Sequence, residues 1–197
     1  MKRWLLLLAC VAGPALAQPN AILLVAKPGL ADPNFRETVV LVTRAPDGST
    51  LGVVLNRPSS MRLAELAPSW PGAERFTQPL HVGGPVMRQV VVALFVSENP
   101  PKATAFHVLQ RVYLSMPPDN IEPLAGEPAT RVRLFAGFAG WAPRQLEAEI
   151  AAGGWYVLRA SEDLVFREDT SGLWTELVAR ARGAHASRGA TTTVATR

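Results

Sequence analysis

The sequence predicts a single α+β domain whose β-strands pair mainly antiparallel. Short apolar runs of strand type outnumber helical patterns, and the strands are not regularly separated by helices long enough for parallel crossovers. The chain has 197 residues, of which 48% are hydrophobic and 18% are charged. This composition supports one buried core and differs from that of a disordered chain. No apolar run approaches the roughly 18 residues of a membrane-spanning helix.

The first 17 residues have the three parts of a secretory signal peptide. Lys2 and Arg3 form a basic start, residues 4–12 form a short apolar run, and Ala15–Leu16–Ala17 matches a small-residue cleavage site. Export would deliver the mature chain, which begins at Gln18, to the periplasm of a Gram-negative bacterium. We therefore expect a periplasmic protein with its leader removed after Ala17.

A lipoprotein is the alternative to a cleaved, soluble export product. Leu7–Leu8–Ala9–Cys10 matches a lipidation box, although only six apolar residues precede Cys10, fewer than the usual apolar region of such a leader. Cys10 is the only cysteine of the chain. Cleavage after Ala17 would leave a mature chain without disulfides, thiolate nucleophiles or cysteine-ligated zinc.

The first half of the mature chain is predicted to contain three strands and a short helix. Residues 21–26 form a continuous apolar run, typical of a buried strand. Residues 38–56 are predicted to form a β-hairpin, because Pro46–Asp47–Gly48–Ser49 is a reverse-turn sequence between two apolar segments. Residues 62–67 are predicted to form a short helix.

The middle of the chain contains the strongest strand signal. Residues 90–96 are seven uninterrupted apolar residues, so we expect this strand to be covered on both faces. Weaker patterns predict strands at 105–109, 111–115 and 131–136, and one or two helical turns within 120–125.

The C-terminal third is predicted to contain two helices, a strand and a tail. Pro143 is placed at a helix start and Gly153 at its end, and a strand follows at 155–158. A helical turn is predicted at 161–164, and the stripe of apolar residues within 171–181 predicts a final helix. The domain is thus expected to span 18–181, and 182–197 to be a disordered tail that contains arginines.

The distribution of charge argues against a nucleic-acid-binding domain. The chain has a formal charge of +4, but six of its twenty bases lie in the leader and the C-terminal tail. Between residues 18 and 179, fourteen bases face sixteen acids, a net charge of −2. We therefore expect no sequence-specific DNA binding, and an unknown protein or a small anionic ligand as the partner.

Motifs of established chemistry are missing from the sequence. There is no G-x-S-x-G, H-E-x-x-H, P-loop or G-x-G-x-x-G pattern, and no two of the three histidines have helical ligand spacing. We therefore assign no catalytic residue, cofactor or metal, and consider a non-enzymatic protein more consistent with the sequence.

Two turn motifs supply the candidate binding residues, which are Asn56, Arg57, His81, Gly83 and Gly84. Each motif joins residues that fix the backbone to residues that make polar contacts. If the fold brings the motifs together, the side chains and the glycine N–H groups could hold an anion or a partner carboxylate. The glycines could instead form a tight turn with positive φ.

Structural roles also account for the two polar residues of the first motif. Asn56 could adopt a left-handed conformation or bond locally. Arg57 could contact an anion, but we favour its pairing with a carboxylate such as Asp32 or Glu37, since a half-buried arginine needs a partner. Trp141, Trp155 and Trp174 are predicted to be core and rim aromatics rather than a stacking platform.

Four ordered motifs resemble the YqgE/AlgH family. They are Pro28–Gly29–Leu30 with Asp32–Pro33–Asn34–Phe35 and Thr38–Val39–Val40; Leu51–Gly52–Val53–Val54–Leu55–Asn56–Arg57–Pro58; Gly83–Gly84–Pro85–Val86; and Gly137–Phe138–Ala139–Gly140–Trp141 with the Gln145–Leu146–Glu147 and Glu149 that follow. The resemblance covers residues 21–179. It implies an α+β fold in which a branched, mainly antiparallel sheet curls into a partial barrel with a few flanking helices.

The same resemblance implies a label, transcriptional regulator, but no catalytic residues. This chain departs from the family pattern at Lys27 and at Met116–Pro117–Pro118, and it has a leader that family members usually lack. We therefore rank three hypotheses for the function. The first is an exported binding or regulatory domain, the second a small hydrolase that uses His81 and a nearby carboxylate, and the third a transcriptional regulator.

Overall fold

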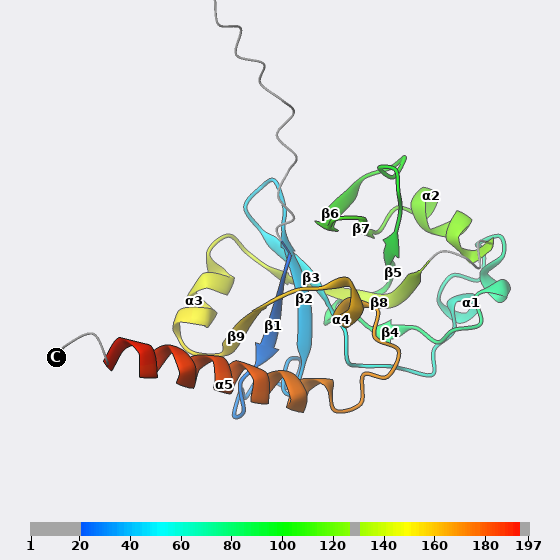
Figure 1. Ribbon diagram of the computed structural model, residues 1–197. Coiled ribbons are helices and arrows are strands. Elements are labelled where there is room, and N and C mark those ends of the chain that lie inside the picture. Colours follow the sequence, from blue (N-terminus) through cyan, green and yellow to red (C-terminus); the bar gives the residue numbers. More distant parts are fainter. Residues whose placement is uncertain (1–20, 127–130, 194–197) are drawn as a thin grey trace, which may run out of the picture.

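The computed structural model describes residues 21–126 and 131–193 (Figure 1). The expected leader, the cleavage site and Cys10 lie outside the described residues. The strands are β1 (Ile22–Ala26), β2 (Val39–Arg44), β3 (Thr50–Val54), β4 (His81–Val82), β5 (Val86–Val96), β6 (Ala105–Leu109), β7 (Val112–Ser115), β8 (Val132–Trp141) and β9 (Trp155–Arg159). The helices are α1 (Leu63–Leu66), η1 (Ala73–Arg75), α2 (Pro118–Ile121), η2 (Glu122–Gly126), α3 (Gln145–Ala151), α4 (Glu162–Val165) and α5 (Leu173–Thr193).

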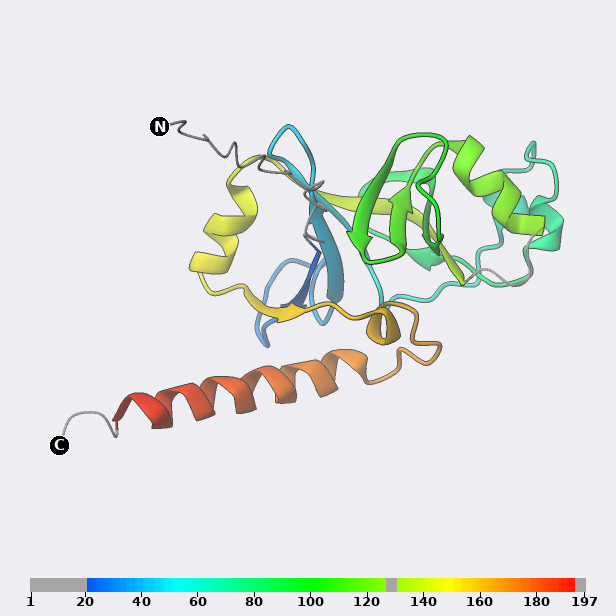
Figure 2. The same cartoon turned by 45° about the horizontal axis from the view of Figure 1, so that its top comes forward.

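The strands form one curled sheet in the order β6-β7-β5-β8-β3-β2-β1-β9, and every pair along this path is antiparallel. The sheet branches at β8, whose first half pairs with β5 and with the short parallel strand β4, and whose last residues pair with β3. The result is a half-barrel with helices on both sides (Figures 1 and 2). The predicted α+β class and the partial barrel implied by the family resemblance are confirmed.

Alternate residues of each strand face different cores, as the pleat requires. In β1, Leu23 and Val25 face the inside of the half-barrel, whereas Leu24 and Ala26 face a second cluster under α3. In β5, Val92 and Leu94 face the inside, and Val91, Ala93 and Phe95 face a third cluster under α1 and α2. Strand β5 is therefore covered on both faces, as its uninterrupted apolar run predicts.

Helices α4 and α5 fill the inside of the half-barrel. Val165 of α4 and Leu173 and Leu177 of α5 are fully or almost fully buried in the same cluster as the inner strand residues. The indole Nε1–H of Trp174 donates to the carbonyl of Ala26 at 2.7 Å, which fixes α5 against β1. These contacts set the position of the loop before α5, which forms one wall of the candidate site.

The predicted hairpin, the short helix after it and the strands at 105–109 and 111–115 are confirmed with small shifts of their ends. Strand β5 is longer than predicted, and it contains an irregularity between Val86 and Val91 opposite β8. Met87 at φ 46° and Gly137 at φ 70° lie at this irregularity. Such bulges are not visible in a hydrophobic pattern, because the pattern records which residues are apolar and not how strands pair.

Helix α5 continues to Thr193, past residue 182 where the sequence analysis expects disorder to begin. The segment lacks an apolar stripe, which is the signal on which that expectation depends. Residues 183–193 also include two glycines and three threonines, which have low helix propensity, so the extension continues a helix that its first turns have already fixed. Within the residues that the structure describes, no helix has the length and apolarity needed to cross a membrane.

Candidate functional site

The structure brings the two sequence motifs side by side. Pro58 and His81 form an isolated antiparallel bridge. The amide of Val82 donates to the carbonyl of Arg57 at 2.8 Å, and the amide of Ser59 donates to the carbonyl of Leu80 at 3.0 Å. The condition on which the candidate site depends, contact between the residues after β3 and those of β4, is therefore met in the fold.

Asn56 neither adopts the left-handed conformation nor bonds locally, because its side-chain amide bonds to the backbone of residues 17 and 19 positions earlier in the chain. Its Oδ1 accepts from the amide of Val39 at 2.8 Å, and its Nδ2 donates to the carbonyl of Glu37 at 2.9 Å. The left-handed residue is Glu37 itself, at φ 57°. The Asn56 amide thus holds a strained bend at the start of β2 and fixes the backbone beside Arg36.

Arg57 is bound to backbone carbonyls, so its predicted pairing with Asp32 or Glu37 is wrong. Its Nη1 donates to Asn34 at 2.7 Å, and its Nη2 donates to Pro33 and Arg36 at 3.3 Å each. A tight turn presents several carbonyls together, and these satisfy a planar guanidinium as well as a carboxylate does. Sequence spacing gives no signal for this kind of partner.

The bonds to carbonyls leave the charge of Arg57 without a full counter-charge. Burial lowers the pKa of Arg57, the neighbouring cations of Arg36 and Arg88 lower it further, and only Asp32 acts in the opposite direction. Arg36 and Arg88 have exposed side chains. Three guanidinium groups therefore lie near one another around a half-buried charge, which favours the approach of an anion.

The glycine pair has a different role from either predicted one. Neither Gly83 nor Gly84 has positive φ, so the tight-turn interpretation is wrong. Both glycines are buried, and a Cβ at either position would overlap the backbone of Gly137 or Phe138 in β8. The amide of Gly83 already donates to Ala136 at 2.9 Å, so it is not available to a ligand. Glycine is needed here for the close approach of two backbones.

His81 is half-buried at the edge of a pocket of about 610 Å³. Burial, and then the cation of Arg133, lower its pKa to about 4, so the ring is neutral at pH 7. Its Nδ1 is buried and has no hydrogen-bond partner within the described part of the chain. Arg133 is itself held by the carbonyls of Val165, at 2.9 Å, and of Arg167.

A second pocket, of about 450 Å³, lies next to the first and is lined by Arg36, Glu37 and Arg57. The two pockets share Asn56, Thr170 and Ser171, so they lie side by side, and together we call them the Arg57–His81 groove. The loop before α5 forms its far wall and contributes Glu168 and Asp169 at the His81 end. Sequence analysis missed this wall, because only the docking of α5 places it there.

The pKa of His81 gives no sign of a carboxylate that orients its ring. Glu168 and Asp169 line the same pocket as His81, yet neither is among the charges that shift its pKa, and a carboxylate that orients a catalytic histidine would raise it. Among residues 21–126 and 131–193, no three histidine, cysteine or carboxylate side chains are grouped so as to hold a metal ion.

The tryptophans belong to the core and its rim, as predicted. Trp141 and Trp155 are each 3% exposed and pack against Phe35, with ring centroids 5.4 and 5.6 Å from it. Both indole N–H groups donate to the same carboxylate oxygen of Glu149, at 3.1 and 3.0 Å. This cluster lies under α3, on the side of the sheet opposite the half-barrel interior.

The chain is therefore a half-barrel α+β domain with a polar groove beside the branch of its sheet. The AlgH-like family model matches residues 23–186, and the chain belongs to this family. It is 38% identical over 172 residues to a UPF0301 protein of Thermobifida fusca, covering 82% of this chain and 86% of that protein. It is 37% identical over 155 residues to a UPF0301 protein of Myxococcus xanthus, covering 77% and 84%.

Two solved structures share the fold. The solution structure of the AlgH protein from Pseudomonas aeruginosa has a TM-score of 0.69 and 26% identity, covering 85% of this chain and 91% of that one. The crystal structure of protein DIP2367 from Corynebacterium diphtheriae has a TM-score of 0.63 and 28% identity, covering 82% and 86%. The family is one of uncharacterised function, so the role of the groove is argued from its own chemistry.

Proposed function

We propose that this protein is an exported, non-enzymatic binding domain that holds a carboxylate in the Arg57–His81 groove. The carboxylate belongs to a small organic acid or to a side chain of a partner protein. The leader supports the export, and no described residue bears on it directly. The observation that carries the binding role is the half-buried guanidinium of Arg57, which lines the groove with Arg36 and whose charge Asp32 offsets only in part.

The chemistry of the groove matches a carboxylate bound at one end of a longer ligand. An anion at Arg57 would offset the mutual repulsion of three guanidinium groups. At the other end, the His81 ring is neutral at pH 7 and provides no positive charge for a second anion. The acids Glu168 and Asp169 make this end unfavourable for a second negative charge. A ligand with an anionic end and a neutral polar end therefore fits best.

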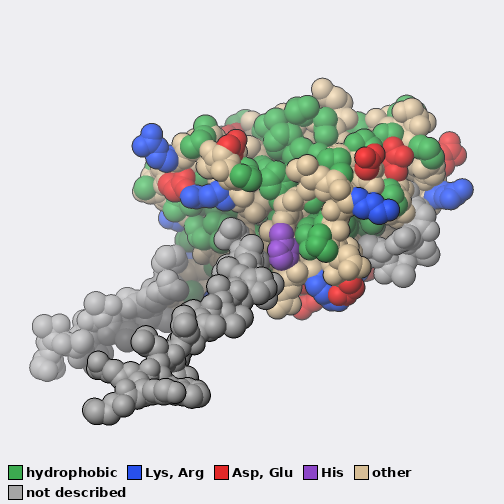
Figure 3. Space-filling view, turned by 90° about the horizontal axis from the view of Figure 1, so that it is seen from above, with side chains coloured by type: hydrophobic (Ala, Val, Ile, Leu, Met, Phe, Trp, Pro, Cys, Tyr) green, Lys and Arg blue, Asp and Glu red, His purple; other side chains and the backbone are tan. Residues whose placement is uncertain are grey.

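Neither alternative function has a comparable observation in its favour. The hydrolase hypothesis needs a carboxylate that orients His81, and the pKa of His81 gives no sign of one. The regulator hypothesis needs a basic face for DNA. On the face seen in Figure 3, basic and acidic side chains are interspersed, and the net charge of residues 18–179 is −2.

An NMR titration with acetate, and with succinate monoamide as the longer probe, tests the proposal. We expect saturable shifts of the amides of Asn56, Arg57 and Ser171, larger for the monoamide, and none of comparable size with chloride at equal ionic strength. Shifts that are absent, or that chloride reproduces, would show that the groove does not bind carboxylates.

A further inference from the structure

The outer edge of β9 is open, and it lies far from the groove in the sheet order. Strand β9 ends the sheet, with β1 as its one neighbour. The amide of Lys27 donates to the carbonyl of Gly154, so these two residues are a hydrogen-bonded pair. In an antiparallel ladder such pairs alternate with pairs that are not hydrogen-bonded. The antiparallel pattern then directs the amides and carbonyls of Val157 and Arg159 away from β1. Among the described residues, no backbone group bonds to them.

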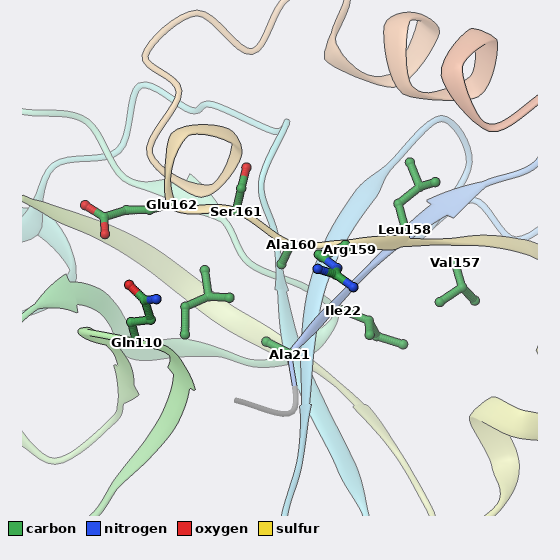
Figure 4. Close-up of a pocket in the computed structure, with 10 residues that line it drawn as sticks. Ala21, Ile22, Gln110, Val157, Leu158, Arg159, Ala160, Ser161 and Glu162 are labelled. Carbon is green, nitrogen blue, oxygen red and sulfur yellow. The ribbon is translucent and has the colours of Figure 1, made fainter. Parts of the chain in front are cut away.

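Three of the features that usually protect an exposed strand are absent from this edge. It has no proline, no lysine and no irregularity of register, whereas β6 at the other end of the sheet contains one. Val157 has 45% of its surface exposed and is one of two large apolar side chains in the described part of the chain to be so exposed. Val157 and Leu158 point to opposite sides of β9 (Figure 4).

A pocket of about 720 Å³ lies at the end of the same strand (Figure 4). One wall consists of Val157 to Ala160 with Ala21 and Ile22, and the opposite wall of Leu109 and Gln110 at the turn between β6 and β7. The lining combines apolar and polar side chains, and among them Arg159 is exposed and forms no ion pair with any described residue. By contrast, Glu162 is already paired with Arg131 at 2.9 Å.

We propose that β9 binds an extended peptide segment of a partner protein by strand addition, with apolar side chains in this pocket and an acidic residue at Arg159. Main-chain bonds to Val157 and Arg159 supply the affinity, as in other cases in which a peptide extends a sheet. The unpaired cation selects the charge of the segment, and the apolar part of the lining selects its alternating side chains. This site is independent of the Arg57–His81 groove.

Hydrogen exchange tests the geometry before any ligand is used. In the purified protein, the amide of Leu158 should be protected because it bonds to β1, whereas the amides of Val157 and Arg159 should exchange rapidly. Protection of all three amides would mean that the edge is already covered and would overturn the proposal.

Selection of displayed random peptides of about eight residues, a usual strand length, then tests the occupant. We expect enrichment of peptides that alternate apolar residues and carry an acid, and slowing of exchange at Val157 and Arg159 by about tenfold or more when one is bound. Val157→Pro should abolish binding, because it removes an outward amide and no bond to β1. If the proline variant does not fold, Val157→Lys replaces it and should also abolish binding, because a lysine on an edge strand opposes strand addition.

Charge reversal tests the specificity with a matched control. Arg159→Glu should weaken an acidic peptide about five- to tenfold, whereas Arg75→Glu, an exposed arginine of η1, should leave its affinity unchanged. Binding that survives Val157→Pro and Val157→Lys, or that responds equally to both arginine variants, would overturn the proposal. A concentration-dependent dimer that Val157→Lys dissolves would assign the edge to a second copy of the chain instead.

Discussion

Replacing Glu149 by alanine should destabilise the domain by about 2–4 kcal/mol, because an unpaired buried donor costs roughly 1–3 kcal/mol. One oxygen of Glu149 accepts the N–H groups of both Trp141 and Trp155, at 3.1 and 3.0 Å, and each indole is 3% exposed. The variant leaves both donors without an acceptor. Glu149→Gln retains an oxygen at the same place and should recover most of the loss.

Glu147 provides a matched control on the same helix. Its carboxylate pairs with Arg44, but the two side chains are 49% and 60% exposed, so Glu147→Ala should cost at most about 1 kcal/mol. Urea unfolding followed by tryptophan fluorescence measures the free energies of unfolding of all variants. Equal stability of Glu149→Ala and Glu147→Ala would refute the argument that the shared carboxylate holds the aromatic cluster together.

Two further outcomes follow from the structure, and one follows from the leader sequence. Gly83→Ala should unfold or severely destabilise the domain because its Cβ would overlap the backbone of Gly137, whereas Gly183→Ala, in open space on α5, should stabilise the domain by about 0.5–1 kcal/mol in thermal unfolding. The pKa of His81 is about 4 when folded against an ordinary 6.5, so the unfolded state binds the extra proton and stability is lost as the pH falls from 6.5 to 4. His81→Phe should remove that part of the loss, and identical pH profiles of the two proteins would contradict the assignment. Intact mass of the protein from host periplasm should place the mature N-terminus at Gln18; a lipidated Cys10 or a retained Met1 would contradict export.

Local features of the fold could be predicted where the sequence itself contains the cause. The turn residues between β2 and β3 specify the hairpin, since proline and glycine fix its backbone angles. The unbroken apolar run of β5 predicts burial on both faces, because successive side chains of a strand point to opposite faces and all of them here are apolar. The branched, curled sheet came only from the family resemblance, and the order of the strands and the place of the branch at β8 were not predicted, because they depend on contacts between distant segments.

The two motifs of the candidate site could be selected from the sequence, but their contacts could not. Asn56, Arg57 and His81 do share a groove, yet Arg57 bonds to carbonyls of a turn more than twenty residues away. Gly83 requires no positive φ, because its constraint is the approach of β8, which the local sequence does not record. The remaining wall of the groove comes from the loop before α5 and depends on the packing of that helix in the half-barrel.

The affinity of the groove for a carboxylate probe, measured with paired charge variants, tests the central claim most directly. Arg36→Gln combined with Arg88→Gln removes two exposed cations and leaves the bonds of Arg57 intact, because Arg36 contributes only its carbonyl to them. The account predicts that the double variant binds succinate monoamide at least about fivefold more weakly than wild type, with the Arg75→Gln control unchanged. Equal affinity of the double variant and wild type would contradict it.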